Sequence, residues 1–331
     1  MEHPGLGALL VSAASTAGAG PLVRSWLHRR QSFDHPNERS SHTVPTPRGG
    51  GLACAVGGVL GATASRLLGS GTTATWLGAS GTLGAVGRAD DVANLPPLLR
   101  LGAQVLTGAV AGSRIGGPFG ATVGAATVPS IVNAFNFMDG INGISGCTAA
   151  AWGVVVVGDP NLTASSRAQG AIVAGMGLGF LPYNVPTASM FLGDVGSYLL
   201  GSGIAVTVLE CSFTDGRPDP RNASRALAPM IPYLADTGLT IIRRLARGDA
   251  VTEAHREHAY QRLVHETGWP HWVVSGLVAS AAASCGLVGR SRNGLAPVVL
   301  IVLLYLASPS LARRARSQQP ESASVVSGEW S

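Results

Sequence analysis

Long apolar segments recur along almost the entire sequence, and most are close to the length of a helix that crosses a bilayer. A search for windows of roughly 17 to 22 apolar or small residues finds about eleven of them. They cover residues 5–25, 50–68, 72–88, 99–115, 118–136, 143–158, 168–185, 195–212, 226–242, 271–289 and 294–311. Several are short or rich in glycine, so ten spans remain an alternative. The pattern predicts an all-α fold, a polytopic helix bundle in a membrane.

The composition supports a membrane location. Only 12% of the residues are charged, whereas about 25% is usual for soluble domains, and so little charge would not cover a soluble surface. The 45 glycines, with many alanines and serines, let transmembrane helices approach closely. No linker marks a second domain. We therefore predict one transmembrane catalytic domain over residues 1–312 and a disordered cytoplasmic tail over 313–331.

The basic residues predict the orientation of the bundle. All 23 are arginines, and with the N-terminus outside, fifteen of them fall in the odd-numbered loops and the C-terminal tail. This excess places those segments in the cytoplasm. Because the arginines form short clusters between apolar runs, they argue against nucleic-acid binding. An alternative for the first segment is a cleaved signal peptide, but its start, MEHPG, lacks the usual basic residues.

Five unusual polar segments fall on the predicted cytoplasmic side. They are SSHTVPTPRGGG (40–51), GRADDVANLPPLLRL (87–101), NAFNFMDGING (133–143), FLGDVGS (191–197) and the histidine-bearing loop 243–270. We expect the active site in the corresponding loops, residues 28–49, 88–99, 136–143, 186–195 and 243–270. The four cysteines have no metal-type spacing and are interpreted as small packing residues.

Four acids in these segments indicate a metal site. Asp90 and Asp91 end the third span, Asp139 follows the fifth, and Asp194 lies in a glycine-rich turn. Taken alone, the aspartate pair is equally consistent with a solvated loop end. Carboxylates gathered at one place repel unless a cation neutralises them, and Mg²⁺ prefers a few carboxylates together with phosphate oxygens. This combination favours phosphate chemistry.

Two further segments suit an anionic ligand. The glycines of PTPRGGG (45–51) leave backbone N–H groups at a helix start, although a simple turn into the membrane explains them equally well. His255 and His258 share a predicted helical face with Arg262. Zinc binding and an amphipathic helix on the inner leaflet are alternatives for this loop.

With these motifs in order, the chain resembles the polyprenyl-phosphate N-acetylhexosamine-1-phosphate transferases, the superfamily of WecA-type and MraY-type membrane enzymes. The likeness rests on SSHTVPTPRGGGLA, DDVANLPPLLRL, NAFNFMDGINGISG, FLGDVGSYLLG and AHREHAYQRL. It implies that a polyprenyl phosphate attacks the sugar-linked phosphate of a UDP-sugar and releases UMP. It also implies Mg²⁺ or Mn²⁺ as cofactor and a multi-pass protein of the cytoplasmic (inner) membrane. A homodimer is left open.

The resemblance also implies residue roles. The catalytic and metal-binding residues would be Asp90, Asp91 and Asp194. The nucleotide and sugar would be bound by Asn133, Asn136, Asp139, Asn142, Phe191, His255, Arg256 and His258. The loop near the lipid phosphate would contribute His42, Arg48, Gly49 and Gly50.

Three departures from the family pattern matter. Asn94 stands where an acid or base often follows the aspartate pair, and Asn142 replaces a frequent carboxylate. The sequence HREH is less histidine-rich than in muramoyl-pentapeptide transferases, which favours the branch that starts O-antigen or other surface glycans. UDP-GlcNAc is the default sugar donor, with GalNAc or FucNAc donors open. A transporter with intramembrane carboxylates is the alternative from another class; a CDP-alcohol phosphotransferase lacks support because its DGxxAR pattern is absent.

Overall fold

The structure is an almost entirely helical bundle. The computed structural model describes residues 4–36, 44–250 and 256–318. Its helices are α1 (Pro4–Arg29), α2 (Gly51–Leu67), α3 (Ala74–Ala93), α4 (Pro97–Phe137), α5 (Ile144–Val157), α6 (Ala164–Asn184), α7 (Gly193–Cys211), α8 (Pro220–Leu227), the 3₁₀ turn η1 (Ala228–Met230), α9 (Ile231–Arg247), α10 (Ala259–Thr267), α11 (His271–Val288) and α12 (Leu295–Ser317). Two short antiparallel pairs join β1 (Phe33–Asp34) to β2 (Thr46–Pro47) and β3 (Phe213–Thr214) to β4 (Arg217–Pro218).

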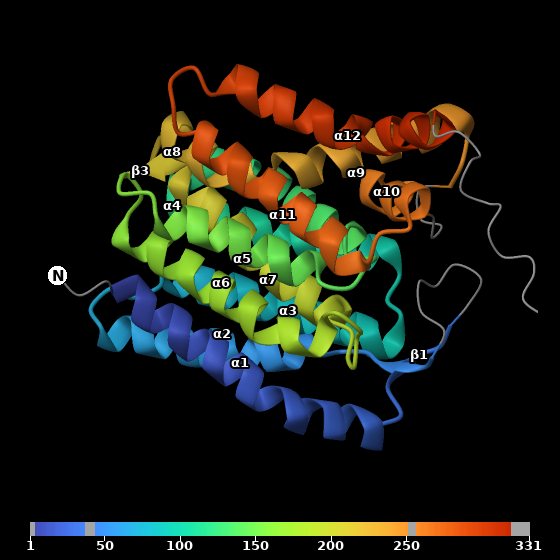
Figure 1. The fold of residues 1–331 in the computed structure, drawn as a ribbon. Helices are drawn as coiled ribbons and strands as arrows, with labels where there is room; N and C mark the ends of the chain where they lie inside the picture. The colour runs from blue at the N-terminus through green and yellow to red at the C-terminus, as the bar shows by residue number, and fades with distance from the viewer. Residues whose placement is uncertain (1–3, 37–43, 251–255, 319–331) are drawn as a thin grey trace, which may run out of the picture.

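The long helices lie side by side, so the connecting segments gather at the two ends of the bundle. Figure 1 shows β1 and α10 at one end and β3 with α8 at the other. Four described helices, α1, α4, α11 and α12, are long and apolar enough to cross a membrane, and α2 and α5 are shorter apolar helices. The prediction of an all-α polytopic membrane protein is confirmed.

Helix α4 contains two of the predicted spans. Gly116 and Gly117 have non-helical backbone angles, and Gly117 has a φ of 63°, so the chain reverses direction there. The two halves then pack backbone against backbone: a Cβ on Gly108 would lie 2.2 Å from the carbonyl oxygen of Gly124. Only glycine permits this approach. The predicted spans 99–115 and 118–136 therefore form a tight helical hairpin.

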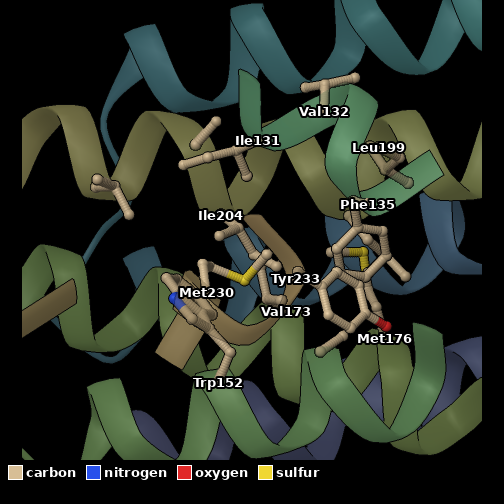
Figure 2. Packing of buried hydrophobic residues seen from close by; sticks show 14 of the residues in the cluster. Ile131, Val132, Phe135, Trp152, Val173, Met176, Leu199, Ile204, Met230 and Tyr233 are labelled. Carbon is tan, nitrogen blue, oxygen red and sulfur yellow. The ribbon is translucent and has the colours of Figure 1, made fainter. Parts of the chain in front are cut away.

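The core joins helices that are far apart in sequence. Figure 2 shows Phe135 of α4 beside Tyr233 of α9, with Trp152 of α5 next to Met230. The rings of Phe135 and Tyr233 are 5.5 Å apart, and the Trp152 indole N–H donates to the carbonyl oxygen of Ala226 over 2.9 Å. The first contact packs α9 against the α4 hairpin, and the second joins α5 to α8. Three cysteines, Cys54, Cys211 and Cys285, are buried between helices, as expected for packing residues.

Two boundaries differ from the prediction. The predicted tail begins at residue 313, but α12 continues to Ser317, and Arg313 in this last part pairs with Glu266 of α10. The ninth span is not one helix, since α8, η1 and α9 follow one another with Pro229 and Pro232 near the junctions. Most of the remaining predicted tail lies outside the described residues.

Candidate active site

A cluster of charged and amide side chains joins four of the predicted motifs. Nη2 of Arg48 lies 2.8 Å from Oδ2 of Asp194, and Nε of Arg48 lies 3.1 Å from Oδ1 of Asp91. The Asn136 amide Nδ2 donates to Oδ1 of Asp194 over 2.8 Å and to the Ser197 hydroxyl over 2.9 Å. Residues from the entrance to α2, the end of α3, the end of α4 and the start of α7 therefore meet at one point.

Asp91 connects the end of α3 to the start of α7. Its carboxylate oxygens accept hydrogen bonds from the backbone N–H groups of Asp194 and Val195, at 2.9 and 3.0 Å. The first N–H groups of a helix have no partners within the helix, and a carboxylate there is also favoured by the helix dipole. Asp91 thus caps α7, and its side chain is only 1% exposed.

Asp90 faces a different set of partners from its neighbour. It accepts a hydrogen bond from the backbone N–H of Leu95 at 2.8 Å and pairs with Nη1 of Arg100 at 2.6 Å. Adjacent residues on a helix point about 100° apart, so the two carboxylates separate. Asp90 holds the turn between α3 and α4, and it brings Arg100 to the edge of the site.

The glycine-rich entrance to α2 packs directly on the turn that carries Asp194. The N–H groups of Gly49 and Gly50 both donate to the carbonyl oxygen of Phe191, at 3.2 and 2.8 Å. Gly193 has a φ of 74°, and a Cβ there would lie 2.9 Å from both Asp91 Oδ2 and the Gly49 Cα. Glycine is therefore required at position 193 for the two turns to touch.

The amide residues of NAFNFMDGING divide between the cluster and the hairpin. Asn136 contacts Asp194, as described above, whereas Asn133 lies one turn earlier and pairs with Gln104 across the α4 hairpin. Its Nδ2 donates to Gln104 Oε1 over 2.7 Å and to the carbonyl oxygen of Pro129 over 2.9 Å. Asn142 lies in the following turn, where Nδ2 donates to the carbonyl oxygen of Pro186 over 3.3 Å.

Asp139 is a half-buried acid beside this cluster. Burial raises the pKa of its carboxyl group to about 6, partly opposed by the hydrogen bond from the Ser145 hydroxyl; the nearby negative charge of Asp194 raises the pKa further, and Arg48 lowers it. The Ser145 hydroxyl donates to Oδ1 over 2.6 Å. At neutral pH a partly desolvated negative charge therefore sits in the turn between α4 and α5.

Replacing Asp139 with asparagine should change how stability depends on pH. The raised pKa means that the folded protein binds a proton more tightly than the unfolded chain between about pH 4 and 6. The stability contributed by this protonation is present below pH 4 and is lost as pH rises through 6. The melting temperature of Asp139→Asn relative to wild type should therefore increase between pH 4.5 and 7.5 in detergent. The exposed control is Asp215→Asn. If the melting-temperature difference between Asp139→Asn and wild type is the same at pH 4.5 and pH 7.5, or changes no more than that of the control, the expectation is contradicted.

The histidine loop lies at the same end but is described only in part. His258 is 3% exposed, and Nδ1 lies 3.3 Å from Oδ1 of Asp236 in α9. Arg256 is exposed. His255 and His42, both predicted ligand contacts, lie outside the described residues.

A cavity of about 600 Å³ opens beside the cluster, between α4, α7 and α9. Arg100, Asn136 and Tyr198 contribute polar groups to its wall. The remainder is mainly apolar and includes Leu101, Ala126, Pro129, Ala134, Phe137, Leu234 and Ile241. The cavity thus combines the positive charge of Arg100 with an apolar wall formed by α4 and α9.

Comparison with known proteins identifies the family. The glycosyl transferase family 4 model matches residues 73–212. The decaprenyl-phosphate N-acetylglucosaminephosphotransferase of Mycobacterium leprae is 31% identical over 92% of this chain and 90% of that protein. The chain belongs to glycosyl transferase family 4.

Two further relatives of this family 4 chain were found. The Mycolicibacterium smegmatis protein of the same name is 29% identical over 90% of this chain and 87% of its own length. The undecaprenyl-phosphate alpha-N-acetylglucosaminyl 1-phosphate transferase of Escherichia coli K12 is 28% identical over 58% of this chain and 54% of its own length. The resemblance inferred from the motifs is confirmed at the level of the family.

The acids of this family 4 site do not form a ready-made metal cage. Within residues 4–36, 44–250 and 256–318, no group of three or more His, Cys, Asp or Glu side chains is arranged to hold a metal ion. Asp91 and Asp194 share Arg48, while Asp90 turns to Arg100. One or two carboxylates completed by phosphate oxygens and water is the usual arrangement for Mg²⁺, and Asp194 with Asp91 fits that description.

Three residues of the site were not singled out in the sequence. Arg100 pairs with Asp90, Ser197 bonds Asn136, and Asp236 lies under the histidine loop. Ser197 belongs to the segment FLGDVGS and Arg100 to GRADDVANLPPLLRL, so their membership of these polar segments could have marked them as candidate site residues. Asp236 lies in the ninth apolar span, where an isolated acid is itself unusual and marks a candidate functional residue.

Proposed function

We propose that this protein transfers an N-acetylhexosamine 1-phosphate from a UDP-sugar to a polyprenyl phosphate, releasing UMP. The observation that carries the proposal is that Asn136, which bonds Asp194 in the cluster with Arg48 and Asp91, also lines a largely apolar cavity together with Arg100. A water-soluble anionic donor and a lipid acceptor meet most easily at such a junction. The relatives' names specify polyprenyl phosphates and N-acetylglucosamine, which makes UDP-GlcNAc the first donor to test.

The acceptor is assigned to the cavity between α4, α7 and α9. Its apolar wall suits the polyprenyl chain, and Arg100 suits the phosphate group because guanidinium binds phosphate oxygens in a charge-assisted, bidentate manner. Arg100 already pairs with Asp90 at 2.6 Å, so its side chain is held at the cavity's polar end. This places the acceptor phosphate next to the cluster around Asp194.

The donor is assigned to the other side of the cluster. Asn136, in the last turn of α4, lies between the cavity and this side. Asp139 and Asn142 follow in the turn between α4 and α5, and the half-buried ring of Phe191 lies on the neighbouring turn. Amide groups there can hydrogen-bond the uridine and the Phe191 ring can stack on the base. Asn133, held in the hairpin by Gln104, is assigned to the wall of the acceptor cavity.

The proposed reaction is a single displacement at phosphorus. An oxygen of the acceptor phosphate forms a bond to the sugar-linked phosphorus, and the bond from that phosphorus to the bridging oxygen breaks, so UMP carries the electron pair away. Arg48 and Arg100 offset the negative charge of the two approaching phosphates. Asp194 and Asp91 would hold Mg²⁺ or Mn²⁺, which supplies further charge neutralisation on the phosphate oxygens.

Membrane orientation follows from the arginine distribution described above. It supports a cytoplasmic location for this end of the bundle, where nucleotide sugars are made available, and we assign the protein to the inner membrane. The product would then start a lipid-linked surface glycan such as O-antigen. A homodimer is compatible with this arrangement.

The direct test is a panel of UDP-sugars supplied to purified protein with undecaprenyl phosphate and Mg²⁺. We expect a lipid-linked sugar diphosphate and one UMP per product, with UDP-GlcNAc among the accepted donors. Preference for UDP-MurNAc-pentapeptide would move the chain to the muramoyl-pentapeptide branch. Absence of lipid-linked product with every donor and polyprenyl phosphate tested would overturn the proposal.

Replacing Arg100 with alanine should weaken acceptor binding selectively. The loss of a charge-assisted hydrogen bond to phosphate is expected to raise KM for polyprenyl phosphate by roughly 10-fold or more, while KM for the UDP-sugar stays within about twofold. Initial rates measured against each substrate separate these effects from a smaller amount of folded enzyme. Arg114→Ala, an exposed arginine elsewhere in α4, is the matched control and should change neither value. Equal KM values in wild type and Arg100→Ala would remove Arg100 from the acceptor site.

A further inference from the structure

A buried acid in α9 holds the first turn of α10. Asp236 is 2% exposed, and its two carboxylate oxygens each lie 3.0 Å from the backbone N of Ala259, the first residue of α10. The Tyr305 hydroxyl of α12 donates to Oδ2 over 2.5 Å, and Nδ1 of His258 lies 3.3 Å from Oδ1. One side chain therefore ties together three separate segments of the chain.

These contacts determine where α10 begins. The N–H groups of a first helical turn lack partners within the helix, and a carboxylate satisfies them while also interacting favourably with the helix dipole. His258 adds a capping box with Gln261. The first turn of α10 is therefore held from α9.

The opposite end of α10 is held by α12. Arg313 Nε donates to Oε1 of Glu266 over 2.9 Å, and Arg316 Nη1 donates to the carbonyl oxygen of Glu266 over 2.8 Å. Figure 1 shows α10 beside this end of α12. With Asp236 at one end and Glu266 at the other, α10 is fixed along its length.

Helix α10 in turn contacts the turn that carries Asp139. A Cβ added to Gly140 would lie 2.3 Å from the Tyr260 hydroxyl oxygen and 3.0 Å from Nε2 of Gln261. The Tyr260 ring, fully buried, stacks on His258 with centroids 5.7 Å apart. A displacement of α10 would thus be transmitted to Gly140 and to the neighbouring Asp139.

We propose that Asp236 is a positioning residue for the donor side of the site. By fixing the start of α10, it holds Tyr260 and Gln261 in contact with Gly140 and so determines the position of the turn between α4 and α5. The inference rests on the proposed function, because it assigns this turn to the UDP-sugar. Asp236 itself does not line the cavity assigned to the lipid, although Leu234 and Thr237 of the same helix do, so the larger effect should fall on the UDP-sugar.

The test compares KM values for the two substrates in Asp236→Asn and Tyr305→Phe. Asparagine keeps the shape of Asp236 but replaces one acceptor oxygen by a donor group, and because both oxygens contact the N–H of Ala259, this donor opposes that N–H whichever way the amide is turned. We expect KM for the UDP-sugar to rise by roughly 10-fold in Asp236→Asn, with KM for undecaprenyl phosphate within about twofold of wild type. Tyr305→Phe, which removes one donor to Asp236 and adds no conflicting group, should show a smaller rise of the same kind.

Asp159→Asn is the matched control. Asp159 is also buried, at 1% exposed, and pairs with Arg225 and Arg290 between α5, α8 and α11, away from the cluster around Asp194. Its loss should reduce the yield of folded protein or the melting temperature without changing either KM.

The outcomes separate the inference from the function on which it rests. A wild-type protein that produces no lipid-linked sugar with any UDP-sugar overturns the proposed function. An active wild type with unchanged UDP-sugar KM in both Asp236→Asn and Tyr305→Phe overturns the positioning role. If Asp236→Asn gives no folded protein, Tyr305→Phe alone decides between the two results.

Discussion

Asp194→Ala is expected to reduce transfer by roughly 1,000-fold or more while leaving the bundle folded. The side chain is 14% exposed and lies between Arg48 and Asn136, and it is the acid best placed to face both phosphates. The backbone N–H of Asp194, which bonds Asp91, is retained in the variant, so the start of α7 should persist. Membranes bearing the variant are incubated with radiolabelled UDP-sugar, Mg²⁺ and undecaprenyl phosphate, and the lipid extract is counted.

Asp194→Asn distinguishes loss of charge from loss of packing. The amide has nearly the same shape, so it should retain the melting temperature of wild type but remain close to Asp194→Ala in activity. Asp215→Asn, an exposed acid in the turn between β3 and β4, is the control and should retain full activity. Normal amounts of lipid-linked product from either Asp194 variant would remove this residue from the reaction site.

Removal of divalent metal is expected to stop turnover completely. Asp91, Asp139 and Asp194 bring negative charge to a place where two phosphates must also bind, and Arg48 contacts two of these acids. Electrostatic repulsion would oppose binding of both substrates without an additional cation. Purified protein treated with excess chelator should show no product, and Mg²⁺ added beyond the chelator should restore the rate.

A binding measurement separates this effect from damage to the protein. In the presence of UDP-sugar, Mg²⁺ should raise the melting temperature of wild type, because a ligand that binds only the folded state stabilises it. The same addition should have little effect on Asp194→Ala. Full activity in excess chelator would contradict the charge argument from which the metal was inferred.

The spans and the common location of the motifs were accessible from sequence because they depend on hydrophobicity and chain direction. Apolar windows locate helices. Each crossing takes the chain to the opposite side and the next one brings it back, so motifs that follow alternate crossings must share an end. The contacts of Asp194 with Arg48 and Asn136, 146 and 58 residues away, confirm that these motifs meet. The tight bend at Gly116 and Gly117 also matches the boundary predicted between two spans.

The individual roles were not accessible because they depend on side-chain direction and on partners remote in sequence. Asp90 and Asp91 form one motif, yet a single helical step directs the first to Arg100 and the second to the start of α7. His258 belongs to a polar loop but is buried against Asp236, 22 residues away. Neither the choice of partners by Asp90 and Asp91 nor the burial of His258 produces a periodic pattern that could be recognised in the sequence.

The hydrogen bonds from α7 to Asp91 affect how mutagenesis of the aspartate pair should be interpreted. Removing this carboxylate would leave two backbone N–H groups without acceptors and would allow the first turn of α7, with Asp194 on it, to shift. An inactive Asp91 variant would thus report a misplaced neighbour as readily as a missing proton acceptor. Assigning a general base in this enzyme therefore requires a rate–pH profile of a variant whose α7 is still anchored, rather than loss of activity alone.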